Sequence, residues 1–135
     1  MRLFADASYW IALLNPRDAL HEKALALHDL HLKDQLVTTE MVLTELLNGF
    51  CEQGPALRRA AAEAVETLRQ RRNVVIFPQT SEQFEKALGR YRAMADKSWS
   101  LTDCASFVLM EAESIRAALT HDRHFLQAGF EARLR

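Results

Sequence analysis

The 135-residue sequence contains few glycines and few cysteines, and both shortages exclude classes of function. Its 4 glycines form no GxGxxG turn, no GxxxxGKS/T loop and no GxSxG elbow. Dinucleotide binding, P-loop nucleotide binding and a serine nucleophile on such an elbow are therefore unsupported. Cys51 and Cys104 lie far apart, form no CxxC pair and have no histidine close in sequence. They indicate reduced thiols in a cytoplasmic protein rather than a disulfide framework.

Long apolar runs and an excess of basic residues are also missing. The longest apolar runs, residues 9–14 and 107–110, are far shorter than the ~20 residues that a membrane helix needs. No signal-like apolar segment precedes Asp6, so we expect a cytoplasmic protein with no membrane partner. With 17 basic and 18 acidic residues, the formal net charge is −1. Because non-specific nucleic-acid binders carry a basic excess, any nucleic-acid role must come from a local site or from oligomer geometry.

The composition and the residue pattern predict one globular α/β domain over residues 1–135. Apolar residues make up 49% of the chain and charged residues 26%, as in ordinary globular proteins. Strands are expected at residues 2–5, 35–38, 73–77 and 115–119, with an edge strand after residue 130. Helices are expected at residues 7–14, 19–33, 39–53, 56–72, 80–96, 102–114 and 122–128. This alternation predicts a parallel sheet that is covered by helices on both faces.

Carboxylates follow several of the expected strands. Asp6 comes directly after the first strand, Glu40 and Glu45 lie on the helix after the second, and Asp122 comes three residues after the fourth. Asp103 lies in the first turn of an almost wholly apolar helix. Because the carboxyl ends of parallel strands meet at one edge, we expect these acids to converge on one cleft. Crowded carboxylates repel one another, and a bound Mg²⁺ or Mn²⁺ ion resolves that repulsion.

Most of these acids also have a structural interpretation. Asp6 and Asp122 stand where a helix cap is expected, and Asp103 completes a Ser-x-x-Asp capping box. Glu40 lies in a first helical turn, where the helix dipole favours negative charge. Glu45 lies about 9 Å from the start of its helix and borders the apolar face, where a charge is costly unless it is paired or bound to metal.

The histidines give a weaker signal than the acids. Three of them share the charged helix at residues 19–33, and His121 and His124 stand three residues apart. Structural zinc sites need four closed ligands, and no cysteine lies near either group, so zinc is disfavoured. His121 or His124 can instead contact a substrate phosphate beside Asp122.

Four short blocks together resemble one known family. They are the opening strand into Asp6-Ala7-Ser8, then Thr44-Glu45-Leu46, Ser100-Leu101-Thr102-Asp103-Cys104 and Leu119-Thr120-His121-Asp122-Arg123-His124-Phe125. Their order and spacing resemble the PIN-domain family, specifically the VapC-like toxin ribonucleases of bacterial and archaeal toxin–antitoxin pairs. Each block alone is unspecific, whereas the four in sequence are specific. The likeness runs from Met1 to about Phe130.

The resemblance implies a set of site residues. The family's acidic quartet maps onto Asp6, Glu45, Asp103 and Asp122. Asp6 and Asp103 would be the principal ligands of Mg²⁺ or Mn²⁺, with the other two acids acting directly or through water. Ser8 and Thr102 match positions where a hydroxyl supports the site. Asp96, in the loop before the third acid, is a candidate accessory acid that matches no specific position of the family.

The resemblance also implies a fold, an activity and partners. It implies a three-layer α/β/α sandwich with a mostly parallel sheet of four or five strands. The implied activity is metal-dependent hydrolysis of RNA phosphodiester bonds by a homodimer that a cognate antitoxin holds inactive. Two alternatives stay open: a DNA or flap-type nuclease that uses the same acids, and a non-catalytic module that keeps the fold and binds a protein partner.

Overall fold

The computed structural model describes residues 1–135 and contains one five-stranded sheet in which every pairing is parallel. The strand order is β3-β2-β1-β4-β5. The strands are β1 (Arg2–Ala5), β2 (Gln35–Thr39), β3 (Val74–Phe77), β4 (Ala117–Leu119) and β5 (Glu131–Ala132). The expected edge strand therefore exists, and the prediction of a mostly parallel sheet of four or five strands is confirmed.

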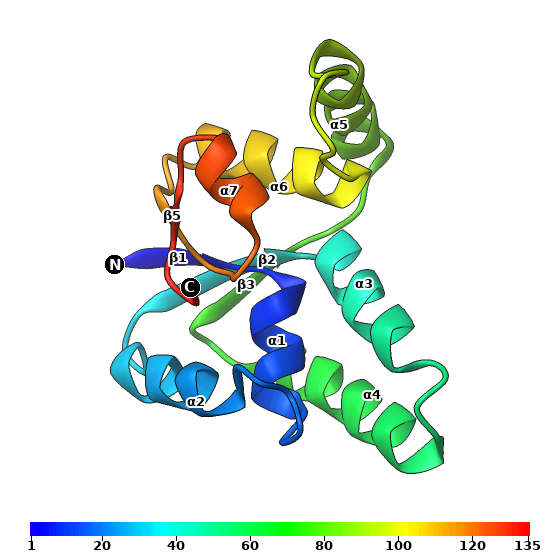
Figure 1. Ribbon diagram of the computed structural model, residues 1–135, viewed down its shortest axis with the longest axis vertical. Helices are drawn as coiled ribbons and strands as arrows, with labels where there is room; N and C mark the ends of the chain where they lie inside the picture. The colour runs from blue at the N-terminus through cyan, green and yellow to red at the C-terminus, as the bar shows by residue number, and fades with distance from the viewer.

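The helices form a layer on each side of this sheet, as Figure 1 shows. On one side lie α1 (Ala7–Leu14), α2 (His21–Leu30) and α4 (Pro55–Gln70), and on the other lie α5 (Ser81–Ala93), α6 (Leu101–Ala112) and α7 (Arg123–Gln127). The helix α3 (Glu40–Phe50) packs against α1 and α4 and also meets α6. The predicted three-layer α/β/α sandwich is confirmed. None of the helices combines the length and the apolar character that crossing a bilayer requires.

The order of the strands determines where a site can form. The chain builds β2 and β3 on one side of β1 and then crosses to build β4 and β5 on the other side. Ala5 of β1 is in register with Leu119 of β4, and the amide of Asp6 donates to the Leu119 carbonyl at 3.2 Å. Sheets of this kind bind ligands beyond the carboxyl ends of the strands where the order reverses, which here is the β1–β4 junction.

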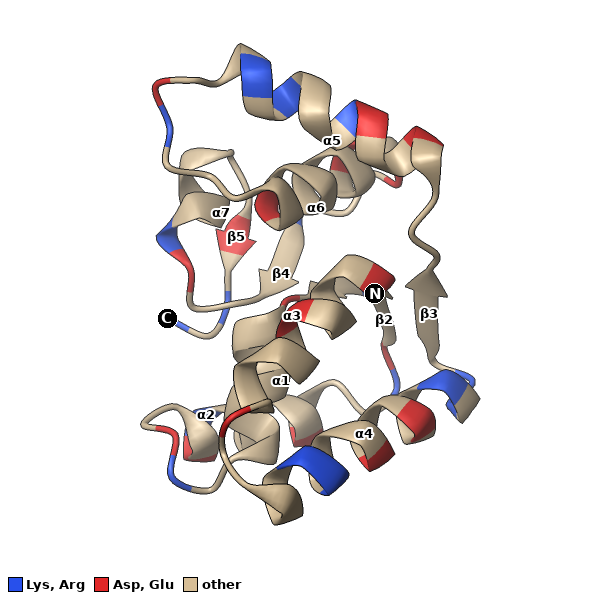
Figure 2. Ribbon diagram, turned by 90° about the vertical axis from the view of Figure 1, so that its right-hand side faces the viewer, with Lys and Arg blue, Asp and Glu red and all other residues tan.

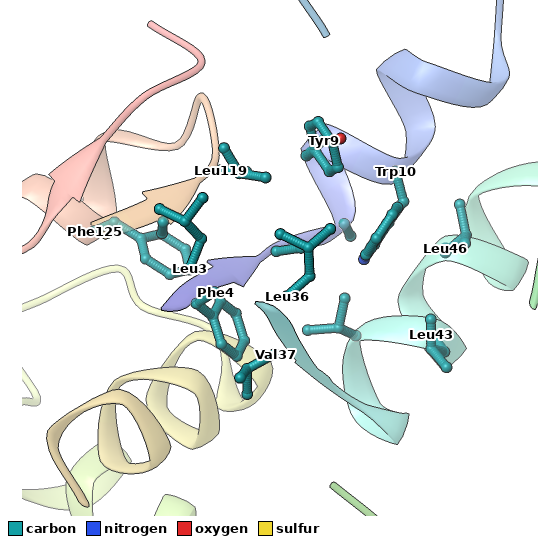
Figure 3. Close-up of a cluster of buried hydrophobic side chains, with 14 of the residues drawn as sticks. Leu3, Phe4, Tyr9, Trp10, Leu36, Val37, Leu43, Leu46, Leu119 and Phe125 are labelled. Carbon is teal, nitrogen blue, oxygen red and sulfur yellow. The ribbon is translucent and has the colours of Figure 1, made fainter. Parts of the chain in front are cut away.

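The core holds the central strand and the helices around it in place, as Figure 3 shows. Leu3 and Phe4 of β1 are fully buried, as expected for a parallel strand that is covered on both faces. The ring centroid of Phe4 lies 6.1 Å from that of Phe125 on α7. Phe107 on α6 packs edge-on against Phe125 with the centroids 4.9 Å apart. These rings fix α6 and α7, which carry two of the expected site acids, against the end of β1.

Several helices are shorter than the sequence predicts, because residues expected inside them act as caps. Thr39 was expected to begin a helix, but it ends β2, and its side chain accepts a hydrogen bond from the Val42 amide as the N-cap of α3. The helix expected over residues 19–33 spans only His21–Leu30. The residues after it form a turn that is closed by a 2.7 Å contact between His31 Nδ1 and Asp34 Oδ2. The helix expected to reach residue 96 ends at Ala93.

Candidate functional site

Asp6 lies at the end of β1 and at the N-cap of α1, but its side chain makes no capping hydrogen bond. Its Oδ2 atom instead accepts hydrogen bonds from the hydroxyls of Thr120 at 2.9 Å and Ser8 at 3.3 Å. Burial raises the pKa of Asp6 to about 6, the Thr120 hydrogen bond lowers it, and the charges of Asp103 and Asp122 raise it further. The structural interpretation, a helix cap, therefore does not describe the Asp6 carboxyl group.

Asp103 does cap a helix, and it also faces the site. Its Oδ2 atom accepts from the Ser100 amide at 3.1 Å, while the Asp103 amide donates to the Ser100 hydroxyl at 3.0 Å, so the predicted capping box is present. The residue is only 7% exposed, and burial is the main cause of its raised pKa. The box uses one lone pair of Oδ2, so the second lone pair of Oδ2 and the whole of Oδ1 remain available to a ligand.

Asp122 joins Asp103 through a histidine. The Asp122 side chain caps α7 by accepting from the His124 amide at 2.9 Å, as one interpretation of the sequence predicts. The His124 ring places Nδ1 at 3.0 Å from Asp103 Oδ2 and at 3.3 Å from Asp122 Oδ1. One potential ligand atom from each of these three residues lies within 4.8 Å of the others, which is a spacing that suits a single metal ion.

Glu45 completes the group of acids from the neighbouring helix. It lies beside the buried Leu46 on α3, at the border of the apolar face as expected, but the residue is exposed rather than enclosed. Its carboxyl group is nevertheless partly desolvated, and this together with the charges of Asp6 and Asp103 raises its pKa to about 7. A hydrogen bond with the Thr102 side chain acts in the opposite direction. Glu45 therefore lies at the rim of the acidic site, where solvent reaches it.

Two other acids near these residues in sequence are engaged elsewhere. Glu40 Oε1 accepts from the Gln79 amide at 2.7 Å, and its Oε2 atom lies 3.4 Å from Arg69, so Glu40 joins α3 to the end of β3 and to α4. Asp96 is exposed and pairs with Lys97 at 3.5 Å. Neither belongs to the acidic group, and Glu40 has the structural role that the sequence suggested.

The two expected supporting hydroxyls lie beside the acids. Ser8 contacts Asp6, lies 3.2 Å from the Thr120 hydroxyl and accepts from the His121 amide at 3.1 Å. The Thr102 side chain lies close enough to Glu45 to lower the pKa of its carboxyl group. The His121 ring faces away from the acids, since its Nδ1 atom contacts a backbone carbonyl near the C-terminus at 3.2 Å.

Sequence reasoning missed two members of the site. Thr120 binds Asp6 because β1 and β4 are neighbours in register, and that adjacency is a property of the fold. His124 was considered for a substrate phosphate and disfavoured as a zinc ligand, and it was not grouped with the four acids. Its spacing of two residues from Asp122 was the available signal, because a residue in the first turn after an N-cap lies close to the capping side chain.

The charge balance of the site favours a divalent cation. The four acids converge from β1, α3, α6 and the N-cap of α7, and none of them forms an ion pair with a lysine or arginine. Figure 2 shows acidic segments of α3, of the start of α6 and of the stretch before α7 around the same region between the helical layers. Carboxylate oxygens are the ligands that Mg²⁺ and Mn²⁺ prefer, so the residues fit such an ion.

Comparison with known proteins finds relatives over almost the whole chain. The model of the PIN domain family matches residues 3–131. A Mycobacterium tuberculosis protein named 23S rRNA-specific endonuclease VapC20 is 30% identical over 131 residues, which cover 95% of this chain and 95% of that protein.

Solved structures agree with this match. The crystal structure of Mycobacterium tuberculosis VapC20, described as a Sarcin-Ricin loop cleaving toxin, superposes with a TM-score of 0.84 at 28% identity and covers 95% of both chains. The structure of FitAcB from Neisseria gonorrhoeae superposes with a TM-score of 0.65 at 16% identity and covers 98% of this chain and 95% of that one. The second likeness supports the fold alone.

Proposed function

The chain belongs to the PIN-domain family, and we propose that it is a metal-dependent endoribonuclease that acts as the toxin of a toxin–antitoxin pair. The observation that carries the proposal is the convergence of Asp6, Glu45, Asp103 and Asp122 without a lysine or arginine partner. A protein-binding scaffold has no reason to gather four carboxylates whose charges raise the pKa values of their neighbours.

Ribosomal RNA is the first substrate to examine. The relative that matches 95% of this chain is named a 23S rRNA-specific endonuclease, and its structure is described as that of a Sarcin-Ricin loop cleaving toxin. The near-neutral net charge of −1 favours recognition of a defined RNA site over indiscriminate binding to phosphate backbones. Such a substrate would place the protein's action in the cytoplasm.

Asp6 and Asp103 would hold Mg²⁺ or Mn²⁺, with Glu45 and Asp122 acting directly or through water. When bound, such an ion activates a water molecule and offsets the charge that develops on the attacked phosphate. The chain's own contribution is orientation: Thr120 and Ser8 fix the Asp6 carboxyl group, and the capping hydrogen bonds fix Asp103 and Asp122. Glu45, at the exposed rim, is placed to orient the attacking water.

Thr102 supports this arrangement through Glu45. The Thr102 side chain lowers the pKa of the Glu45 carboxyl group and so favours its charged form. Burial and the neighbouring acids raise that pKa to about 7 even with Thr102 present, so the loss of Thr102 would raise it further. Thr102 therefore helps to keep Glu45 ionised when the site works.

Regulation and assembly follow from the same proposal. We expect a cognate antitoxin to bind the protein and a homodimer to form. Phe84, Leu88 and Tyr91 stand three or four residues apart on α5 and are 42%, 41% and 52% exposed, which leaves an apolar stripe available for a protein contact. Light scattering of the purified chain, alone and with the antitoxin, measures both assemblies.

Competition between nucleic acids tests the substrate class. A labelled RNA oligonucleotide is incubated with Mg²⁺ or Mn²⁺ and with excess unlabelled RNA or DNA of the same sequence. We expect RNA to suppress cleavage of the label and DNA to suppress it far less. Equal suppression, together with cleavage of labelled DNA, would assign the site to a DNA or flap-type nuclease instead.

A further inference from the structure

His124 occupies an unusual place among the acids, since its Nδ1 atom contacts two carboxylates at once. Nδ1 lies 3.0 Å from Asp103 Oδ2 and 3.3 Å from Asp122 Oδ1. A ring nitrogen carries at most one proton, so it can donate one good hydrogen bond and not two. Only the contact with Asp103 is a hydrogen bond, and Asp122 Oδ1 is brought close to the ring because it accepts from the His124 amide. The same three side chains are spaced so that they could share one cation.

We propose that His124 is a nitrogen ligand of the metal centre and that it makes the centre prefer Mn²⁺ to Mg²⁺. The inference rests on the proposed function in that it assumes a divalent ion among the acids. Both ions prefer carboxylate oxygen, but Mg²⁺ is the harder of the two, whereas Mn²⁺ is a transition-metal ion and accepts an imidazole nitrogen more readily. A site of carboxylates alone has no such preference built into it, and a site with His124 does.

The spacing of the atoms agrees with coordination. An octahedral ion with bonds of about 2.1 Å holds adjacent ligand atoms roughly 3.0 Å apart. The distances of 3.0 Å and 3.3 Å from Nδ1 to the two carboxylate oxygens are close to this value, and one ligand atom from each residue lies within 4.8 Å of the others. The three side chains therefore need little rearrangement to share one ion.

The local structure holds the His124 ring in this position. The His124 amide donates to Asp122 Oδ1 at 2.9 Å, so the histidine and the aspartate are fixed to one another in the first turn of α7. Phe125, the next residue, is fully buried and anchors that turn in the core. The His124 side chain is 19% exposed, which leaves the ring reachable from the site while its orientation is constrained.

The competing interpretation is an ordinary ion pair. In that case His124 Nδ1 carries a proton, donates it to Asp103 and merely positions the carboxylate. The two interpretations differ in one respect that can be measured: a ligand nitrogen is bonded to the metal, and a positioning donor is not. Activity alone does not separate them, because losing either role lowers cleavage.

Manganese spectroscopy makes the distinction without an activity assay. The purified protein is titrated with Mn²⁺ and with Mg²⁺, and pulsed electron paramagnetic resonance of the Mn²⁺ form detects directly bonded ¹⁴N. His124→Asn is the test variant, because the amide keeps a hydrogen-bond donor near the position of Nδ1 but removes the imidazole ligand. His121→Asn is the matched control, three residues earlier and with its ring turned away from the acids.

We expect a ¹⁴N coupling in the wild type and in His121→Asn, and its loss in His124→Asn. Mn²⁺ affinity should fall by about tenfold or more in His124→Asn, in the range seen when metal-site residues are changed, while Mg²⁺ affinity changes much less. His124→Gln is a second variant that removes the imidazole ring. Circular dichroism of this variant and of the wild type shows whether the start of α7 stays folded.

Absence of a ¹⁴N coupling in the wild type, or its survival in His124→Asn, would overturn the assignment of His124. Equal losses of Mn²⁺ and Mg²⁺ affinity would do the same, since a positioning role affects both ions alike. The failure of the proposed function looks different: a protein that binds Mn²⁺ through nitrogen but cleaves no RNA keeps the ligand assignment and loses the ribonuclease. A protein that cleaves RNA but shows no nitrogen ligand keeps the proposed ribonuclease function and loses the assignment of His124.

Discussion

The Thr120 hydroxyl donates a 2.9 Å hydrogen bond to Asp6 Oδ2 across a separation of 114 positions in the chain. The contact exists because β1 and β4 are adjacent and parallel, with Ala5 opposite Leu119. The same hydroxyl accepts from the Asp122 amide at 3.1 Å. One buried threonine therefore ties together two of the four proposed metal-binding acids.

Replacing Thr120 with valine should raise the pKa of Asp6 above about 6, because the hydrogen bond that favours the carboxylate is lost. Metal binding, which needs the charged carboxylate, should then require a higher pH. The free energy of unfolding should fall by about 1–3 kcal/mol, since a buried hydrogen-bonded group loses its partner. Calorimetric titration of Mn²⁺ between pH 5 and pH 8 measures the shift.

Thr38→Val is the matched control for that experiment. Thr38 is fully buried and its hydroxyl donates to the Ala5 carbonyl at 2.9 Å, outside the acidic group. The Thr38→Val variant should lose a similar amount of folding stability and should bind metal with the same pH profile as the wild type. If both valine variants move the profile equally, Thr120 acts through general stability and not through Asp6.

Asp6→Asn should stabilise the metal-free protein at pH 8. The wild-type carboxylate is buried, 5% exposed, with its pKa raised to about 6, so its ionisation at pH 8 opposes folding. Asparagine removes the charge and keeps an oxygen that accepts from Thr120. Thermal melts in the presence of a chelator should show a higher Tm for the variant at pH 8 and a smaller difference at pH 5. A lower Tm at pH 8 contradicts the account.

Much of this arrangement was predicted from the sequence, and the missing parts share one cause. The alternation of strands and helices predicted the parallel sheet, and the acids after the strands predicted the acidic edge. Asp6 occupies the predicted N-cap position, but its side chain makes no capping hydrogen bond, and its contact with Thr120 was not found. Both depend on which strand lies beside β1, and that neighbour is set by tertiary packing and not by local pattern.

The caps at Asp103 and Asp122 show a second limit of sequence reasoning. The Ser-x-x-Asp pattern supports both a capping box and a site carboxylate, and these interpretations compete when only the sequence is known. The structure shows that they are compatible, because the box uses only one lone pair of Asp103 Oδ2 for the Ser100 amide, and Oδ1 makes no hydrogen bond. Only atomic positions reveal how the two oxygens are divided.

Metal removal should make folding stability fall as pH rises from about 4 to about 7. The pKa of Asp6 rises from 3.8 to about 6 on folding, and that of Glu45 from 4.5 to about 7, so the folded protein binds more protons than the unfolded chain in this range. Denaturant unfolding with a chelator measures the slope. Saturating Mg²⁺ or Mn²⁺ should offset the loss at high pH, whereas a slope of the opposite sign contradicts the crowded-acid site.

Glu45→Gln should reduce RNA cleavage by about 100-fold or more, in line with the loss of a group that orients a proton transfer. Glu40→Gln is its control on the same helix, because Glu40 is bound to the Gln79 amide and to Arg69 instead of facing the acids. Cleavage by Glu40→Gln should stay close to the wild-type rate. Equal loss in both variants, with both folded, would remove Glu45 from the site.

The most direct test of the central claim is cleavage of bacterial ribosomal RNA by the purified protein with Mg²⁺ or Mn²⁺. A chelator and the Asp103→Asn variant serve as parallel controls, with circular dichroism to confirm that the variant is folded. The account predicts discrete RNA fragments that disappear in both controls. Intact RNA from a folded, metal-loaded wild-type protein, or fragments that persist with Asp103→Asn, would contradict a metal-dependent ribonuclease built on these four acids.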